Sequence, residues 1–587
     1  MTALLDGLSV LADHWSLVAV VLVCALASQC LVASALRAGF GDALTPVEYF
    51  SLGVAGWIAP VLILSLFWNV GGYIGLTLIG LSAAALLPLL FRFRPRPKPA
   101  PGSTSLILSL FLFLFVLLRL AYISRAILPL YFDSATHYSI VENILAHGGS
   151  WLFDWLSANY YHAGFHFQTA FFASVSRAEV ATAMLVFGQI FLALVPFSVF
   201  FPVRHETNSK WAGVFAIVLS AFGWYMPAHA VNWGKYPALT SLGPILFVLG
   251  LAYLFARRRD IISARRRWML YGLLGMGAFT AVLTHSRSLV VLAIVLLAWV
   301  IATRLEKSSR TWMSFAFVVV VAATSLEYFF IQRREVLALV FDPYLHKGLP
   351  ITALVLLLSI FAWMVYPRLT FVSVLATTLL LGSLFVPVTW IPGYRDLTLL
   401  DRPFVEMILF LPLSLLGGLG LAGLEGKLRG RFAWGKYVGL LAVGGVAIHA
   451  FFTYNLYPSD CCAIAGNDDV VAMAWVEEQL PVQARIVIAS TALKVMPFES
   501  SEGEVGADAG AWIAPLTNRV TVLLPNDLDF DQRPALERLC ELEIGYLFVG
   551  EIGQPFDAHK ILSRPEWYKP LLSMPKTWIF EVIGCDN

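Results

Sequence analysis

The sequence predicts a polytopic α-helical membrane protein with a small α/β domain at its C-terminus. Hydrophobic residues make up 59% of the 587 and charged residues only 13%, whereas soluble domains are about 25% charged. Apolar runs of about 20 residues, the length that crosses a hydrocarbon core, recur up to about residue 455. Beyond that point short alternating runs replace them. The composition excludes a soluble globule, and a net charge of +2 without a basic face excludes a nucleic-acid partner.

About fourteen apolar runs are long enough to predict transmembrane helices. They lie at approximately 16–36, 47–68, 73–91, 105–124, 179–202, 210–228, 238–256, 268–284, 288–304, 311–329, 349–366, 369–390, 404–424 and 436–455.

The basic residues between these runs predict the orientation, because short loops rich in Lys and Arg stay in the cytoplasm. All of the basic clusters fall on one face of a fourteen-span arrangement: 92–98, 204–210, 257–267, 304–310 and 427–436. We therefore expect a multi-pass protein of the plasma or inner membrane whose N- and C-termini lie outside the cytoplasm.

This arrangement predicts four parts. They are an N-terminal extension of three transmembrane helices (1–91), a cytoplasmic linker rich in Pro and Arg (92–104), a transmembrane core (105–456) that carries a large exterior loop (126–178), and an exterior soluble α/β domain (457–587).

The soluble domain, called the tail below, shows strand-like and helix-like patterns in alternation. Strands are expected at 485–489, 519–524, 544–549 and 578–583, and helices at 468–479 and 531–541. Four cysteines in an exterior compartment allow one or two disulfides: Cys461, Cys462, Cys540 and Cys585.

The exterior loop holds the most informative stretch, residues 131–167. Asp133 and His137 are four residues apart and share one face of a helix, with Glu142 further along and offset. The apolar residues between them make the helix amphipathic, as expected for a helix in the membrane interface. Ionisable groups at membrane depth are costly and are usually functional, so Asp133 and His137 are candidate catalytic residues.

Two further groups of exterior residues are candidates for substrate binding. His162 and His166 lie among aromatic residues and a glycine, a composition suited to a sugar or a lipid head group, although aromatic side chains are common at the interface anyway. Cations in three exterior turns suit a phosphate, with head-group binding or snorkelling as the alternative. The turns carry His229, Trp233 and Lys235; His285 and Arg287; and Arg395, Asp396, Asp401 and Arg402.

The chain resembles the GT-C superfamily of membrane glycosyltransferases, which take sugars from polyprenyl-phosphate donors. The resemblance rests on the many spans, on an acid early in the first large exterior loop (FDSATH, 132–137), and on an exterior α/β tail whose segment DAGAWIAPLTNR (508–519) is similar to tails of bacterial members. It implies that Asp133 acts as general base or helps to hold a divalent cation such as Mg²⁺ or Mn²⁺. Three additional spans precede the helix at 105–124, where the family-like core begins. The paired acids of several members are absent here, where Asp133 is followed by Ser134 and then His137.

The resulting hypothesis is inverting transfer of a glycosyl group from a polyprenyl phosphate to a glycan, lipid or protein acceptor at the exterior face, in biosynthesis of the cell envelope. Asp133 takes the acceptor proton, His137 assists, and Lys235 and Arg402 stabilise the phosphate that leaves. The substrate-binding set is completed by His162, His166, His229, Glu142 and Arg395.

Two other functions compete with this hypothesis. A transporter or flippase for a lipid-linked saccharide is the stronger rival, but no internal repeat is evident and the ionisable residues gather in exterior loops. A receptor or assembly protein that uses the tail as its binding module would need fewer spans. Trp512 or Trp567 of the tail could bind acceptor glycan, although such residues are more often part of a core.

Overall fold

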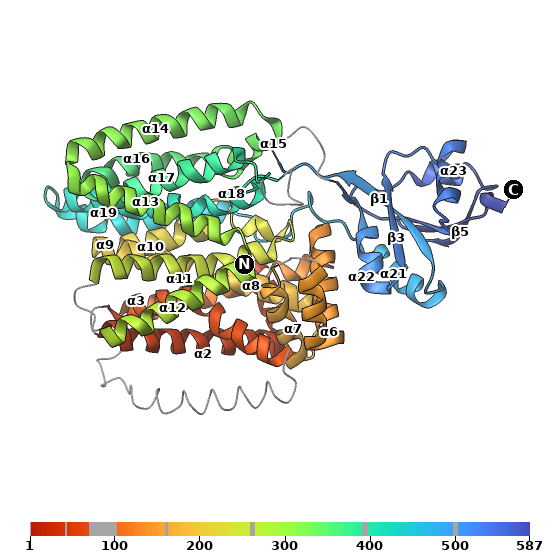
Figure 1. Cartoon of the computed structure of the whole chain (residues 1–587), viewed down its shortest axis with the longest axis horizontal. Helices are drawn as coiled ribbons and strands as arrows, with labels where there is room; N and C mark the ends of the chain where they lie inside the picture. The colour runs from red at the N-terminus through yellow and green to blue at the C-terminus, as the bar shows by residue number, and fades with distance from the viewer. Residues whose placement is uncertain are drawn as a thin grey trace.

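The computed structural model describes residues 2–41, 44–69, 103–158, 162–258, 264–389, 397–496 and 503–586. It consists of a large helical bundle and, at one end of the bundle, the mixed α/β tail (Figure 1). The predicted span 73–91, most of the linker 92–104, and Arg395 lie outside the described residues.

The bundle is built from helices that follow the apolar runs of the sequence. Its longer helices are α1 (Thr2–Asp13), α2 (Trp15–Phe40), α3 (Pro46–Gly56), α5 (Ser103–Leu120), α6 (Phe132–Ala158), α7 (Gly164–Ser176), α8 (Val180–Ser198), α9 (Phe200–Thr207), α10 (Lys210–Val218), α11 (Tyr236–Arg258), α12 (Ala264–Thr284), α13 (Ser288–Ser308), α14 (Arg310–Gln332), α16 (Leu349–Val365), α17 (Pro367–Gly382), α18 (Arg402–Ile408), α19 (Phe410–Arg429) and α20 (Val438–Thr453). Short pieces used below are η3 (Leu219–Gly223), η4 (Ala228–Val231), α15 (Glu335–Ala338) and η7 (Asp342–His346).

Among the described residues, ten helices are long and apolar enough to cross a membrane, or eleven if the bent pair Glu335–His346 and Leu349–Val365 is one span. Two predicted spans fall short of this set. The helix α12 begins with Arg265–Arg267, which lowers its apolar character, and α20 is apolar but has only 16 residues. The polytopic membrane architecture therefore stands, while the number fourteen stays a prediction.

The burial of the helices separates an inner layer from an outer surface. In the segment Val180–Thr207, every residue of the 18-residue apolar stretch is buried, whereas in α14 only 6% of the corresponding stretch is buried. Figure 1 shows α14 along the outer edge of the bundle. Its exposed side chains are largely apolar, with Val318 65% and Phe315 60% exposed. A helix that presents such a face is suited to lipid and not to water.

The ends of the bundle differ in their connections. Figure 1 places α9 and the turn between α13 and α14, both of which carry basic clusters, at the end opposite the tail. The first turn of α6 and the loop before α11 lie at the tail end. All of the site residues described below are at this second end.

The tail contains a six-stranded sheet with the order β2-β1-β4-β6-β5, and β3 also pairs with β1. The strands are β1 (Arg485–Ala492), β2 (Glu504–Gly506), β3 (Val520–Pro525), β4 (Tyr546–Val549), β5 (Tyr568–Ser573) and β6 (Trp578–Val582). Parallel pairs join β1 to β3 and β4, and antiparallel pairs join β6 to β4 and β5. The run of buried residues in β1 fits a central strand that is covered on both faces.

The helices of the tail are α21 (Asn467–Gln479), α22 (Ile513–Thr517), α23 (Arg533–Glu541) and α24 (Ala558–Leu562). The four predicted strands and two predicted helices are confirmed, and β2 and β5 are additional. Disulfides join Cys540 to Cys585 and Cys461 to Cys462, which confirms that the tail cysteines pair.

The tail packs directly on α6. One apolar cluster of the sheet includes Trp512 and Ile513 of the tail and Ala135 of α6, with Tyr138 against it. The rings of Tyr138 and Trp512 meet edge to face, with centroids 5.6 Å apart. Trp512 is fully buried, so its ring is part of the core and is not presented to a glycan. The contact fixes the helix that carries the candidate catalytic residues.

Candidate active site

The first turn of α6 is held by contacts on both sides of its start. Tyr131, just before the helix, adopts a left-handed conformation (φ 70°), and its N–H donates to the carbonyl of Cys462 in the tail at 3.1 Å. The hydroxyl of Ser134 donates to the carbonyl of Leu130 at 2.5 Å. The spacing of Asp133 and His137 then directs both side chains into one cavity.

The loop before α11 comes against this turn at a glycine. Gly234 has φ +64°, and a Cβ added to it would lie 2.6 Å from Oγ and 2.8 Å from N of Ser134. Glycine is the residue that tolerates both this conformation and this close approach. The next residue, Lys235, forms an ion pair with Asp133, and their side chains are 30% and 21% exposed.

A second ion pair comes from two further turns. Arg287 lies between α12 and α13, and Asp401 precedes α18; the guanidinium of Arg287 pairs with one carboxylate oxygen of Asp401. The other oxygen accepts a hydrogen bond from N–H of Phe404 at 3.0 Å and caps the helix. Asp401 therefore positions Arg287 while it anchors α18.

These residues surround one cavity of about 650 Å³ at the tail end of the bundle. Its polar lining comes from five segments of the chain, and its apolar lining includes Val290, Phe404 and Met407. The charged and imidazole side chains in its wall are Asp133, His137, His162, Lys235, His285, Arg287 and Asp401. A volume of this size is typical of pockets for small molecules.

Four imidazoles in and behind the wall are held neutral. Nε2 of His166 lies 3.0 Å from Nδ1 of His137, and the ring centroids of His162 and His285 are 4.2 Å apart. Burial, together with neighbouring imidazoles and cations, lowers the pKa of His137 and His285 well below the usual range and that of His162 and His166 to about 3. A neutral imidazole has one N–H that donates a hydrogen bond and one nitrogen that accepts one, so these side chains suit a ligand that bears hydroxyl groups.

Lys235 is the opposite case. Burial disfavours its ammonium form, but the negative charges of Asp133 and Asp401 outweigh burial and raise the pKa of Lys235 above its ordinary value. Its charge is therefore retained at all physiological pH values. The cavity holds two carboxylates and two cations. A phosphate that enters it could take the place of a carboxylate as the partner of Lys235 or of Arg287.

The structure separates the residues predicted from sequence into two groups. Asp133, His137, His162 and Lys235 line the cavity, and His166 lies directly behind His137. The others lie elsewhere. Arg402 pairs with Glu406 at 3.1 Å and lies over the ring of Trp233, Glu142 bonds to Tyr138 on α6, and His229 lines a second cavity.

The sequence marks Arg287 and Asp401 as charged residues of exterior turns, but it does not predict that they pair, because the pairing depends on how α13 and α18 pack. It does not single out Phe404. Phe404 stacks on His285, with ring centroids 4.7 Å apart, and an aromatic residue at the start of an apolar helix gives no separate signal in the sequence.

The residues around Asp133 do not fit a divalent cation site. The group closest to its carboxylate is the ammonium of Lys235. Within the described ranges, one group of three His, Cys, Asp or Glu side chains lies close enough to share an ion: His229, Cys461 and Cys462. It does not include Asp133, and its two cysteines form a disulfide.

A family model described as a family of unknown function (DUF6541) matches residues 30–393. The chain belongs to this family, because the match covers more than half of its length. No curated protein matches the chain significantly. The matched region includes Asp133, His137, Lys235 and Arg287, whereas Asp401 and the tail follow it. It also spans both sides of the predicted linker.

Proposed function

We propose that the protein is a membrane glycosyltransferase that moves a sugar from a polyprenyl phosphate to a glycan, lipid or protein acceptor, with its site at the exterior face of the plasma or inner membrane and both termini on that side. The observation that supports this most is the single cavity in which Asp133 and His137 meet Lys235 and Arg287. A carboxylate for the acceptor proton and two cations for a phosphate are what this reaction needs.

In the proposed reaction the acceptor hydroxyl attacks the anomeric carbon, and its proton passes to the carboxylate of Asp133. The bond from the anomeric carbon to the phosphate oxygen breaks, and the electron pair stays on that oxygen. Attack opposite the leaving group inverts the anomeric centre. The polyprenyl phosphate leaves with its added charge stabilised by Lys235 and by Arg287, which takes the part that the sequence suggests for Arg402.

The Asp133–Lys235 pair gives the two residues a shared task. A phosphate oxygen that binds Lys235 replaces the carboxylate as its partner. The carboxylate of Asp133, released from the ion pair, can then accept a hydrogen bond from the acceptor hydroxyl. Donor binding would thus free Asp133 for the acceptor.

An apolar groove offers a place for the isoprenoid. It has a volume of about 230 Å³ and is lined almost entirely by apolar side chains of α8, α11, α13, α17 and α19. The groove and the site cavity lie on neighbouring parts of the same helices: Val290 and Met407 line the cavity, and Val291 and Ile408 line the groove. A prenyl chain in the groove would leave its phosphate at Lys235 and Arg287.

The test is transfer of labelled sugar by the purified protein in detergent. A panel of radiolabelled polyprenyl-phosphate sugars is incubated with a membrane glycolipid extract, with and without EDTA. Label that moves from one donor into an acceptor supports a transferase, and loss of activity with EDTA would show that a divalent cation takes part.

The same panel separates the transferase from a flippase for a lipid-linked saccharide. A flippase shows activity only across a sealed bilayer. No transfer from any donor in detergent, together with donor movement across vesicles that contain the protein, would replace the proposal with transport.

A further inference from the structure

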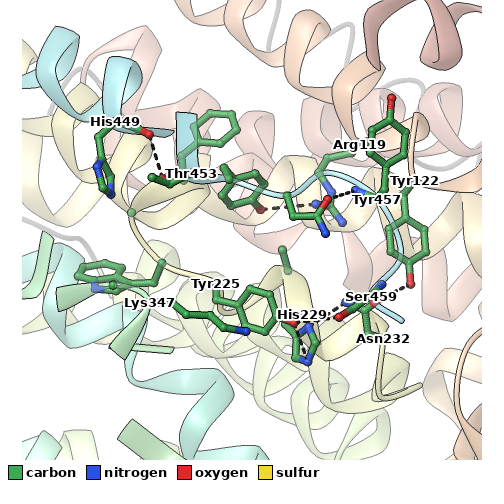
Figure 2. A pocket seen from close by; sticks show the side chains of 17 residues that line it. Arg119, Tyr122, Tyr225, His229, Asn232, Lys347, His449, Thr453, Tyr457 and Ser459 are labelled. Carbon is green, nitrogen blue, oxygen red and sulfur yellow. Dashed lines mark hydrogen bonds between the residues drawn. The ribbon is translucent and has the colours of Figure 1, made fainter. Parts of the chain in front are cut away.

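A second cavity lies at the tail end of the bundle and shares no lining residue with the site cavity. Its volume is about 500 Å³. It is enclosed by the ends of α5 and α20, by the loop from η3 to η4, by the turn after η7 and by the first residues of the tail. Figure 2 shows its side chains, with Arg119 and Lys347 on different sides of the space and Tyr225 beside Lys347.

The wall of this cavity is positively charged. Arg119 and Lys347 are in its lining, and none of the described lining residues is Asp or Glu. Arg119 is only 2% exposed, and its hydrogen-bond partners are neutral: Nε and one amino group donate to Oε1 of Gln189 at 2.9 and 2.5 Å. The other amino group has the hydroxyl of Tyr454 at 3.5 Å. A buried guanidinium without a carboxylate is costly, and an anion in the cavity would remove that cost.

Lys347 stands at the rim of the cavity. Its Nζ lies 4.4 Å from the centroid of the Tyr225 ring, and no carboxylate pairs with it among the residues that the structure describes. A cation–π contact orients an ammonium group but leaves its charge available to an anion. The cavity therefore offers one buried guanidinium, with one amino group that is not bonded to Gln189, and one exposed ammonium group.

A hydrogen-bonded wall fixes the shape between these cations. The hydroxyl of Tyr122 donates to Oδ1 of Asn232 at 2.8 Å, and N–H of Ser459 donates to the same oxygen at 3.1 Å. His229 joins the wall on both sides of its ring, 2.9 Å from Nδ2 of Asn232 and 3.1 Å from the hydroxyl of Tyr225. A wall that is satisfied internally is preorganised for a ligand.

The surroundings of the cavity indicate what carries the anion. His449 and Thr453 of α20 are in the lining, and the neighbouring Phe451 and Phe452 are 81% and 78% exposed. Large apolar side chains exposed at the end of an apolar helix are suited to the membrane interface. A ligand with an anionic head and an apolar chain could therefore reach the cavity from the bilayer.

We propose that this second cavity binds a phosphate group, presented by a lipid head group at the membrane surface. Phosphate fits better than a carboxylate because its three or four oxygens match the separate donors of Arg119 and Lys347. The proposal does not depend on the proposed glycosyl transfer, because the two cavities have different walls.

The experiment measures binding by the full-length protein in a neutral detergent. The probes are dioctanoyl phosphatidic acid, dioctanoylglycerol, which lacks the phosphate, and inorganic phosphate. We expect saturable binding of the phosphatidic acid and none of dioctanoylglycerol. Arg119→Gln and Lys347→Gln should each weaken binding about tenfold or more, because each removes a charge-assisted contact.

The controls separate this site from other effects. Arg334→Gln removes an exposed cation beyond α14 and should bind as the wild type does. Lys347 is exposed, so Lys347→Gln keeps the test valid if Arg119→Gln fails to fold. Inorganic phosphate that binds as tightly as the phosphatidic acid would assign the site to free phosphate esters. Equal binding of dioctanoylglycerol, or unchanged binding by both variants, would overturn the proposal.

Discussion

Replacing Gly234 by alanine should open the contact that brings Lys235 to Asp133. The left-handed conformation at φ +64° costs a residue with a Cβ about 1–2 kcal/mol. The new Cβ would also lie 2.6 Å from Oγ and 2.8 Å from N of Ser134, and an overpacked contact of this kind costs about 1–3 kcal/mol. The sum is about 2–5 kcal/mol, and the loop can relieve it by moving away from α6.

The expected result is loss of sugar transfer with only a local loss of structure. If the substitution raises the activation free energy of transfer by about 1.4 kcal/mol, the rate of transfer falls about tenfold. Transfer rate and thermal unfolding are measured together for Gly234→Ala and for Gly272→Ala. Gly272 lies in α12 with nothing within 4 Å of its added Cβ, so it serves as the matched control. Equal transfer by the two variants would refute the argument that this glycine sets the ion pair.

Three further predictions concern the tail and the buried imidazoles. Cys540→Ser breaks the disulfide to Cys585, which closes a loop of 45 residues, and should destabilise the tail by about 4 kcal/mol in the chain-entropy estimate; unchanged thermal unfolding under non-reducing conditions would contradict it. The pKa of His166, lowered to about 3 by burial, predicts stability that falls as pH drops from about 6.5 towards 3, because only the unfolded state takes up the proton; His166→Gln should flatten that profile. Trp512→Ala removes a fully buried ring that meets Tyr138 of α6, so limited proteolysis should release the tail faster, and a wild-type rate would count against docking through this ring.

The sequence predicts the helical architecture well because membrane spans are the strongest pattern a sequence carries. The order of the spans and the basic loops also predicts that the candidate residues lie together at one end of the bundle. The period of the helix is enough to pair Asp133 with His137, since residues four apart share a face. The tail strands are also visible in the sequence, except β2, which has only three residues, and β5, where Lys569 and Pro570 interrupt the apolar run.

The contacts between distant turns could not be predicted from the sequence. Asp401 and Arg402 are adjacent, and charge alone does not tell which of them faces the cavity. In the structure Asp401 caps α18 and pairs with Arg287, while Arg402 in the first turn of that helix reaches Glu406 one turn later. Helix capping thus decides that Arg287 lines the cavity and that Arg402 does not.

The measurement that tests the central claim most directly compares sugar transfer by the wild type, Asp133→Asn and Glu142→Gln under identical conditions. Both acids lie on α6, but only Asp133 lines the site cavity. We expect Asp133→Asn to abolish transfer while the protein stays folded and binds the donor, and Glu142→Gln to transfer at the wild-type rate. Wild-type transfer by Asp133→Asn would contradict the role of this carboxylate as the general base.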